Sequence, residues 1–179
     1  MMKQIPYGLT DFGRIQKENY YYVDKTMFIE KIEMQPSYLF LIRPRRFGKS
    51  LTLAMLEAYY DVRYADQFDE LFGHLYIGQH PTPIHNQFLI MRFNFSEVSS
   101  NINEVEKSFR LHCCGKLSDF VYRYEHLLGK DIWKVLDEKT QADPGAFLSS
   151  INTYATRKGD IKIYLPVSYT HLRAHETVL

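Results

Sequence analysis

The sequence predicts an α/β fold in which a mostly parallel sheet is flanked by helices. Three apolar runs have the length of buried strands, at residues 38–42, 88–95 and 161–165. Between them, apolar residues recur at spacings of three and four over residues 51–59 and 102–127, which is the period of a helix. Strands that alternate with long helices are typical of a parallel sheet.

The composition is that of a globular protein with a core rich in large rings. Hydrophobic residues make up 45% of the chain, and its 14 Tyr and 12 Phe favour aromatic packing. The formal net charge of +1 argues against a broadly basic nucleic-acid binder. No apolar run approaches the roughly 20 residues of a membrane span, so we expect no membrane partner.

The expected compartment is the cytoplasm. The N-terminal residues contain no apolar signal core. The cysteines, Cys113 and Cys114, are adjacent, which disfavours a bridge between them and favours a reducing compartment. We expect both to be buried on a helix.

The first strand run leads into a basic loop that ends in Gly48, Lys49 and Ser50, and a helix pattern follows at once. Strand, loop, Gly-Lys-Ser and helix, in this order, form the layout of a phosphate-binding loop. Gly48 would let the backbone approach a phosphate, Lys49 would reach the β and γ phosphates, and Ser50 would bind Mg²⁺. The usual pattern opens with glycine, but Arg43 stands there. Either the loop begins with a different turn, or Pro44 sets the bend.

The segment before this loop combines turn signals with aromatic residues. Tyr20 to Val23 could form a short edge strand. Asp24 is expected to cap a helix that holds Phe28, Ile29 and Ile32. The segment would either fold over a nucleotide base or pad the sheet.

Beyond the loop, residues 71–78 predict a loop or short turn with an apolar anchor. Asn101 and Glu104 predict the start of the long helix, and Gly129 its end. A short helix is expected over Ile132–Leu136. Asp143 and Pro144 then open a helix that ends at Gly159, with Phe147, Leu148, Ile151 and Tyr154 in its buried stripe.

Several of these strings together resemble the bacterial AAA-ATPase-like family. The most specific string runs from Arg43 through Pro44, Arg45, Arg46, Phe47, Gly48 and Lys49 to Ser50. Tyr22–Thr26, Met55–Tyr60 and Arg92–Ser96 also carry the resemblance. In that family an arginine stands as a rule where Arg43 stands here.

The resemblance implies a P-loop NTPase-like domain that binds ATP and Mg²⁺ and is usually followed by a nuclease-like C-terminal domain. The implied nucleotide-binding residues are Arg43, Arg45, Arg46, Phe47, Gly48, Lys49, Ser50 and Leu51, with Ser50 also on the metal. The resemblance also allows nucleic acid as a partner through the missing C-terminal region. The resemblance implies nothing about oligomeric state.

The family's acidic Walker-B-type segment is due after the third strand run, where the chain instead reads from Pro166 to Thr177 without an acidic pair. Because this string is similar to a translated sequencing adapter, we expect a partial domain over residues 1–165 and a non-native tail over 166–179. The sheet would then be incomplete at its C-terminus, ATP hydrolysis would be lost, and no catalytic residue is assigned.

Two other functions remain open. The basic stretch from Arg43 to Lys49 could contact nucleic-acid backbone, or the chain could be a non-catalytic interaction domain. His171 and His175 have helical metal-ligand spacing, but with no third ligand nearby we do not expect a metal site there. Asp61, Asp66, Asp69 and Glu70 are expected to form a solvated acidic face, and His74, His80 and His85 a solvated loop.

Overall fold

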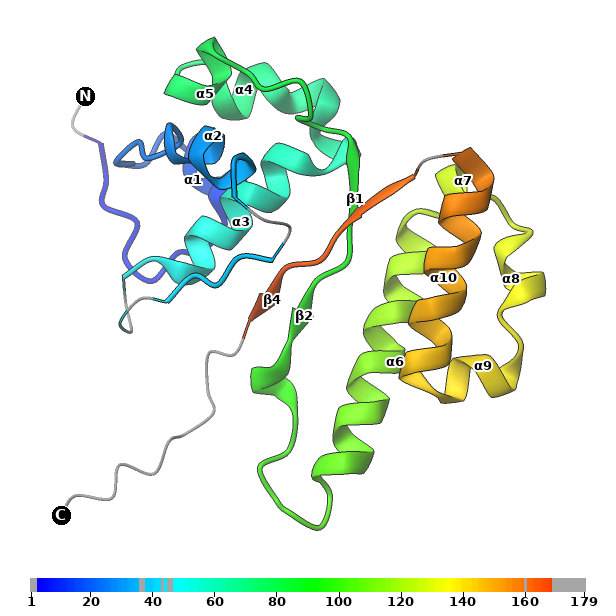
Figure 1. The fold of residues 1–179 in the computed structure, drawn as a ribbon. Helices are drawn as coiled ribbons and strands as arrows, with labels where there is room; N and C mark the ends of the chain where they lie inside the picture. The colour runs from blue at the N-terminus through cyan, green and yellow to red at the C-terminus, as the bar shows by residue number, and fades with distance from the viewer. Residues whose placement is uncertain (1–2, 36–37, 43, 45–46, 160, 169–179) are drawn as a thin grey trace, which may run out of the picture. The chain divides into compact units, whose positions relative to one another are not determined.

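The structure is a computed structural model that describes residues 3–35, 38–42, 44, 47–159 and 161–168 (Figure 1). The chain divides into two compact units, residues 1–88 and 89–179. Each unit has a core of its own: Phe12, Tyr59 and Phe72 are buried in the first, and Leu117, Phe120 and Phe147 in the second.

The described part of the first unit is helical. Its elements are α1 (Phe12–Lys17), α2 (Phe28–Glu33), α3 (Lys49–Tyr60), the 3₁₀ helix η1 (Val62–Gln67), α4 (Phe68–Phe72) and α5 (Tyr76–Gln79). Helix α1 packs against α3 and α4, and α4 against α5. The expected loop or short turn over residues 71–78 is confined to residues 73–75, between α4 and α5. Its apolar anchor is confirmed, because Leu71, Phe72 and Ile77 are buried.

Aromatic rings fill the core of this unit. The ring of Phe72 lies 4.9 Å from Phe12 and 5.5 Å from Tyr59, measured between centroids. Phe68 stacks on Phe72 at 5.4 Å, and Tyr22 meets Phe12 edge-on. Offset and edge-on rings are favourable contacts beyond the area that they bury. The aromatic core that the composition predicts is therefore confirmed here.

The segment Tyr22–Thr26 is neither a strand nor a helix cap of the predicted kind. Helix α2 has Met27 at its N-cap position and no side-chain cap. Asp24 instead accepts hydrogen bonds from the backbone N–H of Tyr76 (2.8 Å) and of Thr26 (2.8 Å). The buried Thr26 hydroxyl accepts from Ile77 N–H at 3.1 Å. The two side chains therefore cap α5, a helix far along the chain.

The second unit pairs strands and packs helices beside them. Its strands are β1 (Phe88–Ile90, which begins at the last residue of the first unit), β2 (Phe93–Asn94), β3 (Lys162–Tyr164) and β4 (Val167–Ser168). β1 pairs with β3, and β2 runs parallel to β4 with Phe93 opposite Val167 and Asn94 opposite Ser168. Its helical elements are η2 (Phe95–Glu97), α6 (Val105–Arg123), α7 (Glu125–Leu128), α8 (Ile132–Val135), α9 (Glu138–Ala142) and α10 (Pro144–Gly159).

Helices α6 and α10 lie side by side in this unit (Figure 1). Asp143 caps α10 by accepting from Ala146 N–H at 2.7 Å, and Phe147 and Ile151 are buried, as predicted. The long helix was predicted to end at Gly129, but α6 already ends at Arg123. Gly129, with φ of +82°, ends the separate helix α7. On α6, Cys113 and Leu117 are buried, and Cys114 is half-buried.

The strand predictions are confirmed only in part. The expected strand over 88–95 is interrupted after Ile90, and Phe95 already belongs to η2. Within the described residues, Tyr20–Val23 and residues 38–42 form no strand. The long helix was predicted to start at Asn101, but α6 begins at Val105, and Ile102 lies before it. Ile102, Val105 and Phe109, which were expected in its buried stripe, are exposed. A strand needs a neighbour to hydrogen-bond with, and apolar composition alone does not supply one.

In the part of the chain that the structure describes, no helix is long and apolar enough to cross a membrane.

Candidate phosphate-binding site

The candidate site lies at the start of α3. Gly48 is the N-cap residue, with φ of +75° and ψ of 20°. This left-handed conformation strains any residue that carries a Cβ atom. A Cβ placed on Gly48 would have nothing within 4 Å, so the backbone angle and not crowding favours glycine. The structure therefore confirms that the Gly-Lys-Ser string stands at the start of a helix.

The first turn of α3 offers backbone donors. The carbonyl of Gly48 accepts from Thr52 N–H at 2.8 Å and from the Thr52 hydroxyl at 2.9 Å. The N–H groups of Lys49, Ser50 and Leu51 precede this first helical bond, and no described side chain caps them. Such a turn attracts anions through its N–H groups and through the helix dipole.

The structure describes some of the predicted site residues but not the arginines. Phe47 is exposed, and Lys49, Ser50 and Leu51 are half-buried. Lys49 forms no ion pair with another described residue, so its ammonium group is not committed to a carboxylate. Arg43, Arg45 and Arg46 lie outside the described residues.

The far end of α3 is fixed by a buried chain of hydroxyl groups. Thr82 N–H donates to the Tyr59 hydroxyl at 2.8 Å, and the hydroxyls of Tyr59 and Thr82 lie 2.9 Å apart. The Thr82 hydroxyl donates to the Glu33 carboxylate at 2.8 Å, and so does the Tyr60 hydroxyl at 3.0 Å. Burial raises the pKa of Tyr59, which keeps this hydroxyl protonated. These bonds join the C-terminal end of α3 to α2 and to the segment that follows α5.

The acidic residues after α3 are not a solvated face throughout. Asp61 is buried and caps η1 by accepting from Arg63 N–H at 3.0 Å. The Arg63 guanidinium donates to the same carboxylate at 2.7 Å. The prediction for Asp61 was wrong because the sequence does not reveal that a paired cation would cover it. His85 is half-buried against the ring of Phe68, which also departs from the expected solvated loop.

Sequence reasoning missed a polar cluster in the second unit, after β2. Glu97 accepts from the Asn94 amide at 3.2 Å, lies 3.3 Å from Lys116 Nζ and 3.6 Å from His112 Nδ1. The hydrogen bond from Lys116 lowers the pKa of Glu97, whereas burial lowers the pKa of His112. The signal for it was present: Asn94 ends a strand run, and carboxyl ends of parallel strands gather polar groups.

Among the described residues, no three His, Cys, Asp or Glu side chains are grouped so as to hold a metal ion. His171 and His175 lie outside the described residues.

A glycine-capped helix start that carries lysine and serine defines the chain as a candidate phosphate-binding protein of the α/β class. A family model described as "Predicted AAA-ATPase" matches residues 6–168, and the chain belongs to this AAA-ATPase-like family. It is also 49% identical over 55 residues to a protein of Azotobacter chroococcum mcd 1 named "Uncharacterized protein in vnfD 5'region". The aligned stretch covers 30% of this chain and 11% of that relative. No solved structure matches.

Proposed function

We propose that this chain binds ATP at the start of α3. The loop and first-turn N–H groups and Lys49 hold the β and γ phosphates, and the Ser50 hydroxyl binds Mg²⁺. The observation that carries the proposal is the left-handed Gly48 directly before a helix whose first residues are Lys49 and Ser50. Membership of the AAA-ATPase-like family supports nucleotide use in general.

The arginines that precede Gly48 are also part of the proposed site. Arg43, Arg45 and Arg46 precede Gly48 in the sequence and would add positive charge beside the phosphates. Phe47 and Leu51 flank the Gly-Lys-Ser string and would contribute their backbone groups to the loop. The proposed compartment remains the cytoplasm.

We further propose that the chain as given does not hydrolyse ATP. Hydrolysis by this class needs a carboxylate that holds Mg²⁺ and a group that orients the attacking water. After the third apolar run, the sequence from Pro166 to Thr177 contains no acidic pair to supply them.

Titration with a fluorescent ATP analogue in the presence of Mg²⁺ tests the site. We expect Lys49→Ala to weaken binding by at least about tenfold, because a charge-assisted contact to phosphate is worth about 1.5–3 kcal/mol. Lys107→Ala removes an exposed lysine in the second unit and is the matched control. Indistinguishable curves for the unchanged chain and Lys49→Ala would remove the site from consideration.

Measuring phosphate release tests whether the chain hydrolyses ATP. We expect no turnover above the Lys49→Ala background, and steady Mg²⁺-dependent release would contradict it. A nucleic-acid-binding module would behave differently: its affinity for DNA or RNA would fall steeply with salt and would not need Mg²⁺. A folded chain that binds neither ligand would support the interaction-domain alternative.

A further inference from the structure

The imidazole of His112 lies between α6 and η2, within the second unit. Its side chain is only 8% exposed, and its ring packs against Phe95 with 5.9 Å between the centroids. The Nδ1 atom of His112 lies 3.6 Å from a carboxylate oxygen of Glu97, and Lys116 Nζ lies 3.3 Å from the same oxygen. Phe95 and Glu97 belong to η2, whereas His112 and Lys116 belong to α6. These side chains form a contact, which we call the η2 clasp, that joins η2 to α6.

The other ring nitrogen of His112, Nε2, is buried without a hydrogen-bond partner in the part of the chain that the structure describes. A neutral imidazole carries one N–H group and one bare nitrogen. The carboxylate of Glu97 therefore favours the hydrogen on Nδ1, which leaves Nε2 with its lone pair. A protonated imidazole carries N–H groups on both nitrogens, and the buried Nε2–H would then have no acceptor. An unpaired buried donor is destabilising, and more so when it is charged.

We propose that the η2 clasp is acid-sensitive: it holds while His112 is neutral and opens when the imidazole takes up a proton. Opening would free η2 and the residues that follow it from α6. One bond between these segments can report on the change, because Ser99 N–H donates to the hydroxyl of Ser108 on α6 at 2.9 Å.

The charges around the imidazole do not compensate for its burial. Burial has the largest effect and lowers its pKa, Glu97 raises the pKa, and Lys116 lowers it. Glu97 is already paired with Lys116. The strands next to η2, β2 and β4, contain no ionisable side chain. Arg110 of α6 and Asp143, just before α10, act on the neighbouring Cys114.

Acid should therefore weaken the clasp. Because the folded pKa of His112 is lowered, its contribution to stability is full above the ordinary histidine pKa of about 6.5 and is lost as pH falls through the folded pKa. Glu97 stays ionised over this range, because the hydrogen bond from Lys116 lowers its pKa below the ordinary glutamate value of about 4.3. His112 is thus the group of the clasp that titrates.

Amide hydrogen exchange at Ser99 tests the clasp in the full chain. We expect the protection of Ser99 N–H, corrected for the intrinsic exchange rate, to fall at least about threefold between about pH 7.5 and about pH 5.5. His112→Gln cannot take up a proton and should show equal protection at both values. His126→Gln changes an exposed histidine of the same unit and should keep the fall. Equal protection at both values in the unchanged chain, or an unaltered fall in His112→Gln, would overturn the proposal.

An NMR titration of the His112 ring in the unchanged chain makes the test independent of any effect of the substitution on folding. The ring should titrate below the ordinary histidine value, with the same midpoint as the loss of Ser99 protection. Different midpoints would contradict the proposal. The amide of Tyr124, just beyond the other end of α6, should keep its protection. A parallel fall at Ser99 and Tyr124 would indicate general unfolding and would overturn a local release.

Discussion

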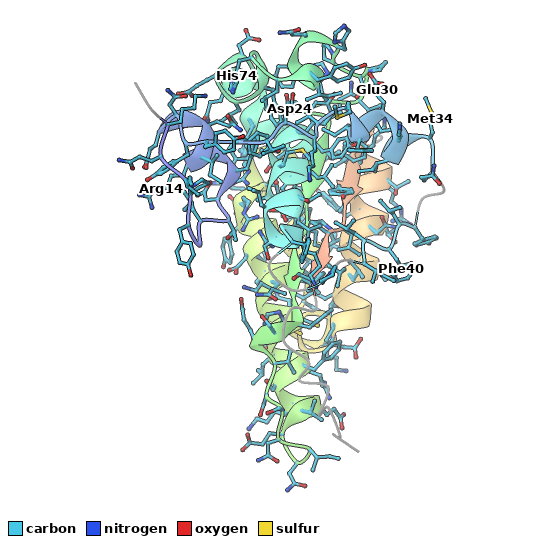
Figure 2. All side chains as sticks on the ribbon, turned by 90° about the vertical axis from the view of Figure 1, so that its left-hand side faces the viewer. Arg14, Asp24, Glu30, Met34, Phe40 and His74 are labelled. Atoms are coloured by element: carbon cyan, nitrogen blue, oxygen red, sulfur yellow. The ribbon has the colours of Figure 1, made fainter. Side chains whose placement is uncertain are left out.

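Asp24 connects two segments that lie 52 positions apart in the sequence. Burial raises the pKa of its carboxyl group, but hydrogen bonds from Tyr76 N–H, Thr26 N–H and the Thr26 hydroxyl outweigh burial. The net result is a pKa below the ordinary range of aspartate, to which nearby His74 also contributes (Figure 2). A strongly hydrogen-bonded carboxylate stabilises the fold only while it is ionised.

Acid should therefore release the cap on α5. Because the folded pKa of Asp24 is lowered, its stabilising contribution is full above the ordinary aspartate pKa of about 4 and is lost as pH falls through the folded pKa. Asp24→Asn should cost about 1 kcal/mol at neutral pH, the typical value of a helix cap, and should remove this part of the acid sensitivity. The rate of amide hydrogen exchange at Tyr76 measures the loss of the cap directly.

The exposed Lys25→Ala is the control, because it changes the neighbouring charge and leaves the cap intact. If Tyr76 N–H exchanged at the same rate in Asp24→Asn as in the unchanged chain, the cap would be energetically unimportant.

At the scale of elements, a buried tyrosine joins the end of α6 to a strand of its unit. Tyr124, at the C-cap position of α6, is fully buried, and its hydroxyl accepts from Ile90 N–H at 2.9 Å. Ile90 is the last residue of β1. This hydrogen bond gives the final N–H group of the strand a partner where β1 ends and β2 has not begun.

Tyr124→Phe should destabilise the second unit by about 1–3 kcal/mol, because it leaves a buried N–H group without its acceptor. Tyr122→Phe makes the same chemical change two residues earlier, where the side chain is 68% exposed, and should be nearly neutral. Chemical denaturation followed by the fluorescence of Trp133 reports on this unit. Equal midpoints for the two variants would count against the anchoring role of Tyr124.

At the scale of the whole molecule, large apolar side chains stay exposed in both units. Ile42 and Phe40 stand out in the first, and Ile102 and Leu111 in the second. Isolated exposed apolar residues are ordinary, but a continuous run promotes association.

We therefore expect poor solubility and a broad, early gel-filtration profile for the unchanged chain. Phe40→Lys should narrow the profile without making it ideal, because the exposed residues of the second unit remain. A sharp monomer peak from the unchanged chain would argue against this view.

The sequence by itself determined the local features of this protein. The cap at Asp143 and the glycine turn into α3 were predictable, because each depends on backbone preferences within a few residues. The proposed phosphate site rests on such a feature, and for this reason Gly48, Lys49 and Ser50 could be found without coordinates.

Only the tertiary structure decided which apolar surfaces are covered. The runs at 38–42 and 88–95 look alike in the sequence, yet among the described residues only the second forms strands that pair in a sheet. Asp24 likewise caps a helix whose position the sequence did not reveal. Strand pairing and distant caps depend on segments that the fold brings together. Local sequence preferences do not specify which distant segments come into contact.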